Sequence, residues 1–230
     1  MELELGGERV GLIPPAGAHL PDQRALLVAD LHLGKGAAFR AAGRPVPAGT
    51  SAETLERLSA LLRATPRGTA LWILGDLFHS PSGVTPGLEE RWRRWRAEHP
   101  DTTIHLVHGN HDRTLLGVAR HWGCRVVSAP ARLGGLELRH IPRERHGSPD
   151  DGPGVAGHLH PAVLLREGRR SSLRLPCFWL RGPDLVLPAL GAFVDGAKLS
   201  PFVGDRIFVP VGDQILEVPP AQLPSSARTG

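Results

Sequence analysis

Five short segments of this chain carry side chains that commonly bind divalent metals. They are Asp30-Leu31-His32, Gly75-Asp76, Gly109-Asn110-His111-Asp112, His140 and Gly157-His158-Leu159-His160. Carboxylate, amide and imidazole ligands without a thiolate favour Mn²⁺, Fe or Zn²⁺. Seven of these side chains are too many for one ion and suit two ions: Asp30, His32, Asp76, Asn110, His140, His158 and His160. The sequence therefore predicts a centre of two divalent metal ions.

The spacing within the segments indicates how the ligands divide. Residues i and i+2 of an extended backbone point the same way, so Asp30 and His32 can share one ion, as can His158 and His160. Asp76 is the carboxylate expected to bridge the two ions. The glycines that precede three of the ligands let the backbone approach closely. Two adjacent cations can bind a phosphoryl oxygen and lower the pKa of a water between them, which predicts phosphoester hydrolysis.

The ligand expected from the fourth segment has two candidates. His140 directly ends an alternating apolar segment, residues 136–139, and is the preferred one. His146 is the alternative. It lies in the polar segment 142–154, whose prolines and glycines predict a loop.

The segments follow elements that can position them. Apolar runs at 25–29, 71–74 and 103–107 predict buried strands, and the amphipathic stretches 55–62, 88–95 and 115–122 predict helices between and after them. Such alternation predicts a largely parallel sheet, at whose carboxyl edge functional groups collect. Within 91–96, arginines flank two tryptophans. Leu88, Trp92 and Trp95 share one helical face, which favours a core role over nucleic-acid binding.

The second half of the chain predicts a different architecture. Short β-like segments at 136–140, 162–165, 177–180, 185–187 and 206–211 are separated by Gly, Pro and Asp, which indicates hairpins and a second sheet. We expect one domain over residues 1–218. Residues 219–230 lack periodicity and are expected to form a disordered tail.

Composition excludes several classes of protein. The 230 residues include two cysteines, too few for a disulfide scaffold or a four-cysteine zinc site. No apolar run approaches the ~20 residues of a membrane helix, and the acidic first residues are unlike a targeting segment, so the expected location is cytoplasmic. A net charge of +4 permits an anionic partner without requiring one.

The ordered set of motifs from Asp30 to His160 resembles the calcineurin-like metallophosphoesterase superfamily. The resemblance implies an α/β fold, a four-layer α/β/β/α sandwich with two central mixed sheets and a dinuclear centre. By that pattern Asp76 bridges both ions. The first ion adds Asp30, His32 and His160, and the second adds Asn110, His140 and His158. A hydroxide between the metals attacks phosphorus, His111 protonates the leaving oxygen, and Asp112 orients that imidazole.

A narrower resemblance covers nearly the whole chain. The segments 28–35, 74–79, 157–161, 175–180 and 187–191 are similar to those of the ligase-associated, PdeM-type phosphoesterases of the DNA damage response. That subfamily implies an Mn²⁺-dependent endonuclease with DNA as substrate, a role in DNA repair, and association with an ATP-dependent DNA ligase and a helicase. Fe or Zn²⁺ remain alternatives to Mn²⁺.

Three further residues are candidates for contacting substrate: Lys35, His79 and Arg143. Two alternative functions stay open. One is a small-molecule phosphatase or nucleotide pyrophosphatase of the same superfamily, although no long apolar insertion between Asn110 and His140 provides a cap for a lipid. The other is a non-catalytic metal-binding scaffold in a repair complex. A dimer is possible, because the two sheets have edges to pair.

Overall fold

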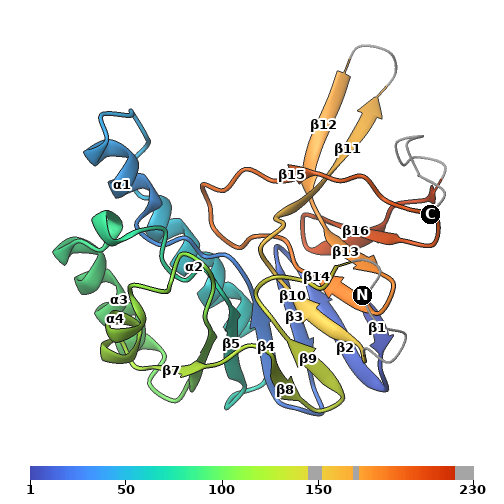
Figure 1. The fold of residues 1–230 in the computed structure, drawn as a ribbon, viewed down its shortest axis with the longest axis horizontal. Coiled ribbons are helices and arrows are strands. Elements are labelled where there is room, and N and C mark those ends of the chain that lie inside the picture. Colours follow the sequence, from blue (N-terminus) through green and yellow to red (C-terminus); the bar gives the residue numbers. More distant parts are fainter. Residues whose placement is uncertain (145–151, 168–170, 221–230) are drawn as a thin grey trace.

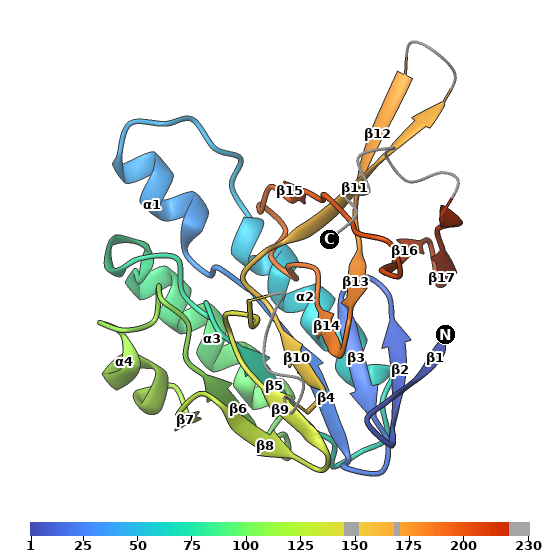
Figure 2. The same ribbon diagram turned by 45° about the vertical axis from the view of Figure 1, so that its right-hand side comes forward.

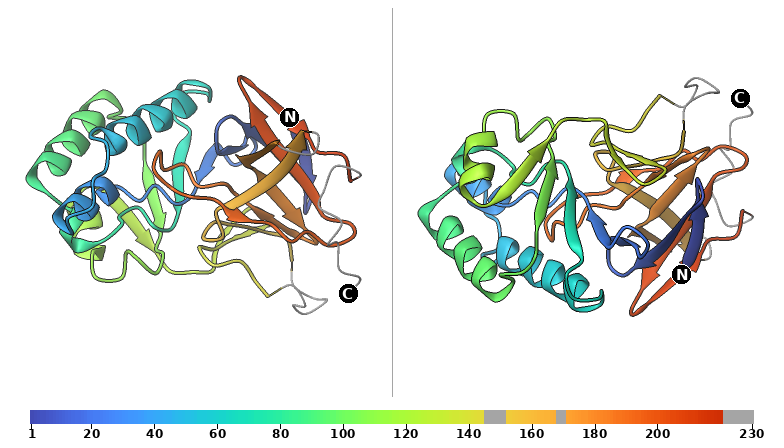
Figure 3. Two further views of the ribbon diagram at one scale, coloured as in Figure 1. Left: turned by 90° about the horizontal axis from the view of Figure 1, so that it is seen from above. Right: turned by 90° about the horizontal axis from the view of Figure 1, so that it is seen from below.

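The computed structural model describes residues 1–144, 152–167 and 171–220 of the chain. Within these residues, two seven-stranded sheets lie at the centre of the molecule, with a smaller three-stranded sheet beside them. Four α-helices gather on one side, away from the C-terminal strands (Figure 1 and Figure 3).

The first sheet has the strand order β1 to β7, which is also the order along the chain. Its strands are β1 (Glu2–Leu5), β2 (Glu8–Ile13), β3 (Gly17–Leu20), β4 (Ala25–Val28), β5 (Ala70–Leu74), β6 (Ile104–Val107) and β7 (Cys124–Val127). Strands β1 to β4 pair antiparallel, and β4 to β7 pair parallel. The predicted parallel part is thus confirmed, while the antiparallel meander before it was not predicted.

The helices cover one face of this sheet. They are α1 (Lys35–Ala41), α2 (Thr50–Arg63), α3 (Pro86–Glu98) and α4 (Leu116–His121), and a short 3-10 helix spans Pro81–Gly83. Strand β4 shows how the layers form. Leu26 and Val28 pack with the helices, whereas Ala25 and Leu27 face the second sheet. This alternation buries both faces of the strand.

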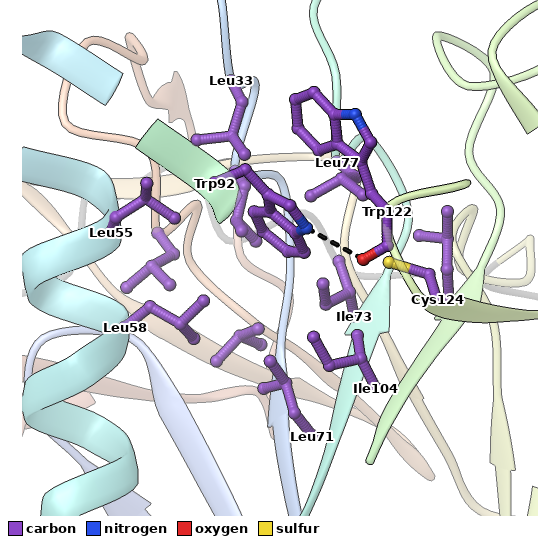
Figure 4. Close-up of a cluster of buried hydrophobic side chains, with 14 of the residues drawn as sticks. Leu33, Leu55, Leu58, Leu71, Ile73, Leu77, Trp92, Ile104, Trp122 and Cys124 are labelled. Carbon is purple, nitrogen blue, oxygen red and sulfur yellow. Dashed lines mark hydrogen bonds between the residues drawn. The ribbon is translucent and has the colours of Figure 1, made fainter. Parts of the chain in front are cut away.

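Helix α3 supplies the large side chains of that layer. Its N-cap Thr85 accepts a hydrogen bond from the backbone N–H of Leu88, and Leu88, Trp92 and Trp95 are buried as predicted. The indole N–H of Trp92 donates to the carbonyl of Trp122 over 2.9 Å, which satisfies the buried polar atom (Figure 4). Arginines on the outer face of α3 pair with Glu90.

The second sheet has the order β17-β16-β13-β14-β10-β9-β8. Its strands are β8 (Ala131–Leu133), β9 (Leu136–Leu138), β10 (Gly154–Ala156), β13 (Phe178–Arg181), β14 (Asp184–Val186), β16 (Arg206–Val211) and β17 (Gln214–Glu217). Strand β10 pairs parallel with both β9 and β14, and the other pairs are antiparallel. The two sheets share a core that includes Leu27, Leu138 and Phe178.

The expected α/β fold with two central mixed sheets is confirmed, but its outermost layer differs from the expectation. The second sheet is covered by the small sheet of β12 (Ser171–Pro176), β11 (Pro161–Glu167) and β15 (Ala197–Lys198). Val163, Trp179 and Ile207 belong to the core beneath it. Among the described residues no α-helix follows α4, and the apolar segments there are short and closely flanked by prolines and glycines.

Two other expectations concern the ends of the structure. Residues 221–230, most of the expected tail, lie outside the described residues, as does His146. No helix in the described part of the chain has the length and apolar character needed to cross a membrane.

Candidate metal centre

The loops after five strands bring the seven predicted ligands together. Asp30 and His32 follow β4, Asp76 follows β5 and Asn110 follows β6, while His140 follows β9 and His158 and His160 follow β10. The two sheets connect directly here, because the backbone N–H of His158 donates to Oδ2 of Asp30 over 2.8 Å. The site therefore lies where the carboxyl ends of strands from both sheets meet.

Left-handed turns, rather than extended backbone, aim these side chains. Six non-glycine residues of the described chain have positive φ, and five of them are predicted ligands: Asp30 (55°), His32 (45°), Asp76 (49°), His158 (68°) and His160 (44°). This conformation is unfavourable for residues with a Cβ, and such strain concentrates at functional sites. The i, i+2 reasoning therefore assumed the wrong backbone conformation. It paired Asp30 with His32 correctly, but its second pair is corrected, because His160 lies with Asp30 and His32 whereas His158 lies with Asp76 and His140.

The glycines before three ligands have no room for a side chain. A Cβ on Gly75 would overlap the His140 ring, and one on Gly109 would overlap Oδ1 of Asp76. A Cβ on Gly157 would lie 2.7 Å from Oδ2 of Asp30. The predicted close approach of backbone to the ligands is confirmed.

The ligand atoms form two groups. Asp30, His32 and His160 each offer an atom within 4.8 Å of the others, and Asp76, His140 and His158 form a second group of the same kind. Asp76 faces both groups, since Oδ2 lies 3.8 Å from Nε2 of His32 and Oδ1 lies 3.5 Å from Nε2 of His140. The two triads fit a dinuclear centre, and the position of Asp76 suits a shared ligand.

The chemistry of the first triad fits a cation. Asp30 is fully buried, and its Oδ1 has no hydrogen-bond partner. The Nε2 atoms of His32 and His160 lie 3.3 Å apart, and Nε2 of His160 lies 3.5 Å from Oδ1 of Asp30. Leaving a carboxylate oxygen buried without a partner is costly, and a bound cation removes that cost.

The second triad fits a cation for a different reason. Nδ1 of His140 lies 3.1 Å from the Leu74 carbonyl, which only accepts, so Nδ1 carries a hydrogen and Nε2 is the nitrogen available to a metal. That Nε2 lies 2.8 Å from Oδ1 of Asn110 and 3.1 Å from Nδ1 of His158. Acceptor atoms that converge on one point suit a cation, and Asn110 lies with this group as predicted.

Burial sets the protonation of the ligands. Desolvation, with a smaller contribution from the neighbouring His160, lowers the pKa of His32 to about 2. Desolvation also lowers the pKa of His158. It raises the pKa of Asp76, and the nearby His140 opposes that rise. Neutral imidazoles are the form that binds metal, so His32 and His158 are ready to act as ligands at neutral pH.

His111 lies beside the centre as predicted, but Asp112 does not orient its ring. The carboxylate of Asp112 is buried and accepts from the backbone N–H groups of Phe78 and Gly109 over 3.1 and 2.9 Å. The Nδ1 of His111 instead donates to the carbonyl oxygen of His79 over 2.7 Å. Asp112 therefore shapes the loop that carries Asn110 and His111, and a backbone carbonyl sets the ring.

The three expected substrate contacts have different outcomes. The His79 ring stacks on that of His111, with 5.4 Å between centroids, and Lys35 lies near it at the start of α1. Arg143 is not in the centre. Its guanidinium is 8% exposed and pairs with Glu137 and Asp184 over 2.6 and 2.9 Å.

This ion-pair network lies at the far end of β10 from the metal centre. A side chain at Gly154, the first residue of β10, would meet both Asp184 and Arg143, whereas His158 follows the end of that strand. The expectation that Arg143 contacts substrate is therefore corrected. Arg143 follows His140 closely in the sequence, but the structure places its side chain with Glu137 and Asp184, away from the metal centre.

Comparison with known proteins defines the class of this fold and site. Residues 23–178 match the family model described as calcineurin-like phosphoesterase, and the chain belongs to that family. Among solved structures, the chain is similar to the crystal structure of Pseudomonas putida nuclease MPE. The sequences are 32% identical, the TM-score is 0.77, and the match covers 95% of this chain and 99% of the other. The search of curated proteins gave no match.

Proposed function

We propose that the protein is a metal-dependent phosphodiesterase that cleaves nucleic acid. The observation that carries the proposal is the pair of triads, of which the second contains Asp76 and the first lies beside it, in a chain similar over nearly its whole length to a nuclease. Two bound cations would polarise the phosphoryl group and supply an activated water as nucleophile. Asp30, His32, Asp76 and His160 would hold one of them, and Asp76, Asn110, His140 and His158 the other.

His111 is positioned to protonate the leaving oxygen. Because its Nδ1 donates to the His79 carbonyl, the opposite nitrogen, Nε2, is the one turned to the centre, 4.0 Å from Oδ2 of Asp76. In the protonated ring Nε2 also carries a hydrogen, which it can transfer to the oxygen that leaves phosphorus. Asp112 contributes by fixing the loop that presents His111.

The surroundings of the centre suit an extended anion. A cavity of about 250 Å³ adjoins the second triad and is lined by Asn110 and His140 together with Arg113 and Arg139. Cationic walls beside a phosphodiester centre favour a polymer that continues past the scissile phosphate. The similarity to a nuclease supports the same substrate class.

The subfamily resemblance supplies the finer parts of the proposal. We propose Mn²⁺ as the metal, with Fe or Zn²⁺ as alternatives, DNA as the substrate and DNA repair as the role. Association with an ATP-dependent DNA ligase and a helicase, and a cytoplasmic location, belong to the same proposal.

The test is a comparison of diester and monoester hydrolysis. Metal-free protein is supplied with Mn²⁺ and assayed on bis-p-nitrophenyl phosphate, p-nitrophenyl phosphate and labelled DNA, with Asp76→Ala as the control. We expect cleavage of the diester and of DNA, lowered at least about a hundredfold by Asp76→Ala. Monoester cleavage alone would indicate a small-molecule phosphatase. Inactivity on all three, with two metals bound, would favour a scaffold.

A further inference from the structure

Two phenylalanines and two cations gather beside the metal centre, outside the residues that the proposed reaction uses. Lys35 and Phe39 lie one turn apart on α1, and Phe193 lies in the segment between β14 and β15. The Lys35 ammonium is 5.7 Å from both phenyl rings, and the Arg44 guanidinium is 5.6 Å from the Phe39 ring. The carboxylate of Asp195 attracts the Lys35 ammonium electrostatically. With two cations and this one anion, the cluster has a net positive charge.

The cluster is continuous with the centre through ring contacts. The Phe39 ring meets the Phe193 ring at 6.0 Å and the His79 ring at 5.5 Å, each edge to face. The His79 ring in turn lies 5.7 Å from that of His32, a ligand of the first triad. The ring contacts lead from the first triad to the phenylalanines, so a group bound on them would belong to a nucleotide close to the phosphate held at the centre.

The segment carrying Phe193 is anchored to the metal-binding loop. The backbone N–H groups of Leu190 and Gly191 donate to the carbonyls of Ala29 and Asp30 over 2.9 and 3.1 Å. The N–H of Ala192 donates to the hydroxyl of Thr54 on α2 over 3.0 Å.

Gly191 also has no room for a side chain, because a Cβ there would lie 2.8 Å from the Leu31 carbonyl. These contacts fix Phe193 relative to Asp30, yet 38% of Phe193 stays exposed. The fold thus holds in place an aromatic ring that the core does not cover.

We propose that Phe193 and Phe39 form a stacking site for an unpaired nucleobase beside the scissile phosphate, with Lys35 and Arg44 contacting the adjoining phosphates. The inference rests on the proposed function and deepens it by naming a base-recognition site. Aromatic rings interleaved with cations are the general means of binding single-stranded nucleic acid, because every base has a face that can stack. Within a duplex that face is covered, because each base stacks on its neighbours.

The experiment removes either the ring or the base. Wild type and Phe193→Ala are assayed with Mn²⁺ on thymidylyl-thymidine and on two analogues in which one sugar, 5′ or 3′ of the phosphate, lacks its base. Phe193→Trp tests rescue by another ring. Leu173→Ala is the matched control, because Leu173 is 59% exposed on the β11–β12 hairpin, which projects on the other side of the molecule from α1 (Figure 2).

We expect loss of one of the two bases to lower kcat/KM of the wild type by about tenfold or more, and that of Phe193→Ala by less than about twofold. Phe193→Trp should restore the wild-type sensitivity. Equal sensitivity of wild type and Phe193→Ala to base removal would overturn the stacking site.

A binding measurement separates this inference from the proposed function. Fluorescence anisotropy without metal compares a labelled oligothymidylate with an abasic oligomer of the same length. If no substrate is cleaved, the phosphodiesterase proposal fails. A lower affinity of Phe193→Ala than of the wild type for the oligothymidylate would by itself still support the stacking site. Equal affinity of wild type and Phe193→Ala for the oligothymidylate would overturn it.

Discussion

His111 has its ring fixed at one nitrogen and free at the other. Its Nδ1 donates to the His79 carbonyl, and 38% of its side chain is exposed beside Asp76. Nε2 therefore faces the open side of the centre, on a ring that is held by a backbone atom rather than by the neighbouring carboxylate of Asp112. In the proposed reaction this ring protonates the leaving group, whose demand for a proton differs between substrates.

His111→Asn is expected to slow cleavage of a dinucleotide far more than that of bis-p-nitrophenyl phosphate. A sugar alkoxide needs a proton to leave, whereas p-nitrophenolate leaves without one, and general acid catalysis contributes about 10²–10⁴-fold. The measurement is kcat on both substrates for wild type and variant. The same loss on both would show that His111 has another role.

His32 predicts how the metal-free protein responds to acid. Burial lowers the pKa of His32 to about 2 from its usual value of 6.5, so between these values the unfolded chain binds a proton that the folded chain does not. The contribution of His32 to the free energy of unfolding is therefore fully present above about pH 6.5 and is lost progressively as the pH decreases. His158 and His79, whose pKa values burial also lowers, act in the same direction, while the raised pKa of Asp76 opposes them.

The corresponding measurement is urea unfolding with a chelator at about pH 7 and about pH 5. Wild type should lose about 2 kcal/mol more than His32→Asn over this interval, since one proton changes stability by about 1.4 kcal/mol per pH unit. Equal losses would mean that His32 is protonated in the folded protein.

At the scale of elements, the turns after the strands aim the ligands. Gly109 precedes the turn that follows β6, and a Cβ built on it would overlap Oδ1 of Asp76. Gly117, on α4, has nothing within 4 Å of a Cβ built on it. The same substitution at these two glycines thus separates a steric effect on the centre from a general effect of alanine.

Gly109→Ala should weaken metal binding at least about tenfold, because the added methyl displaces the carboxylate expected to bridge the ions. Gly117→Ala should leave metal binding as in the wild type and stabilise the fold by up to about 1 kcal/mol, since alanine favours helix. Titration calorimetry with Mn²⁺ measures the first effect and thermal unfolding the second. Unchanged metal affinity in Gly109→Ala would contradict the assigned role of Asp76.

The elements that could be predicted are those with a strong local pattern. The apolar runs before Asp30, Asp76 and Asn110 predict β4, β5 and β6, and the helical spacing of Trp92 and Trp95 predicts the buried face of α3. The positive φ values could not be predicted, because aspartate and histidine adopt this conformation more often than most residues but still rarely, so their presence does not locate it.

Contacts between segments that are distant in the sequence could not be predicted either. Arg143 pairs with Glu137 and Asp184, which lie on β9 and β14, and only the tertiary structure brings these strands together. Phe193 meets Lys35 for the same reason, since its segment is held by Asp30 rather than by its neighbours in sequence.

At the scale of the molecule, the metal centre joins the two sheets. Its first triad combines Asp30 and His32 of the first sheet with His160 of the second, and its second triad combines Asp76 with His140 and His158. Cations bound at such a boundary contact only the folded arrangement, so their binding free energy adds to the stability of the whole domain.

Mn²⁺ should therefore raise the midpoint of thermal unfolding. At a free concentration of about 100 times Kd, one site that binds only the folded state adds about 2.7 kcal/mol. Asp76→Ala should show a clearly smaller shift in the same calorimetric scan. Equal shifts in wild type and variant would place the bound Mn²⁺ elsewhere on the molecule.

The most direct test of the account is the number of metal ions bound per chain. Metal-free protein is loaded with Mn²⁺, freed of excess metal by gel filtration and measured by atomic emission against protein concentration. The paired triads predict two Mn²⁺ per chain in the wild type and fewer in Asp76→Ala, whose bridging carboxylate is missing. One ion or none per wild-type chain, under conditions where diesters are cleaved, would contradict a dinuclear centre.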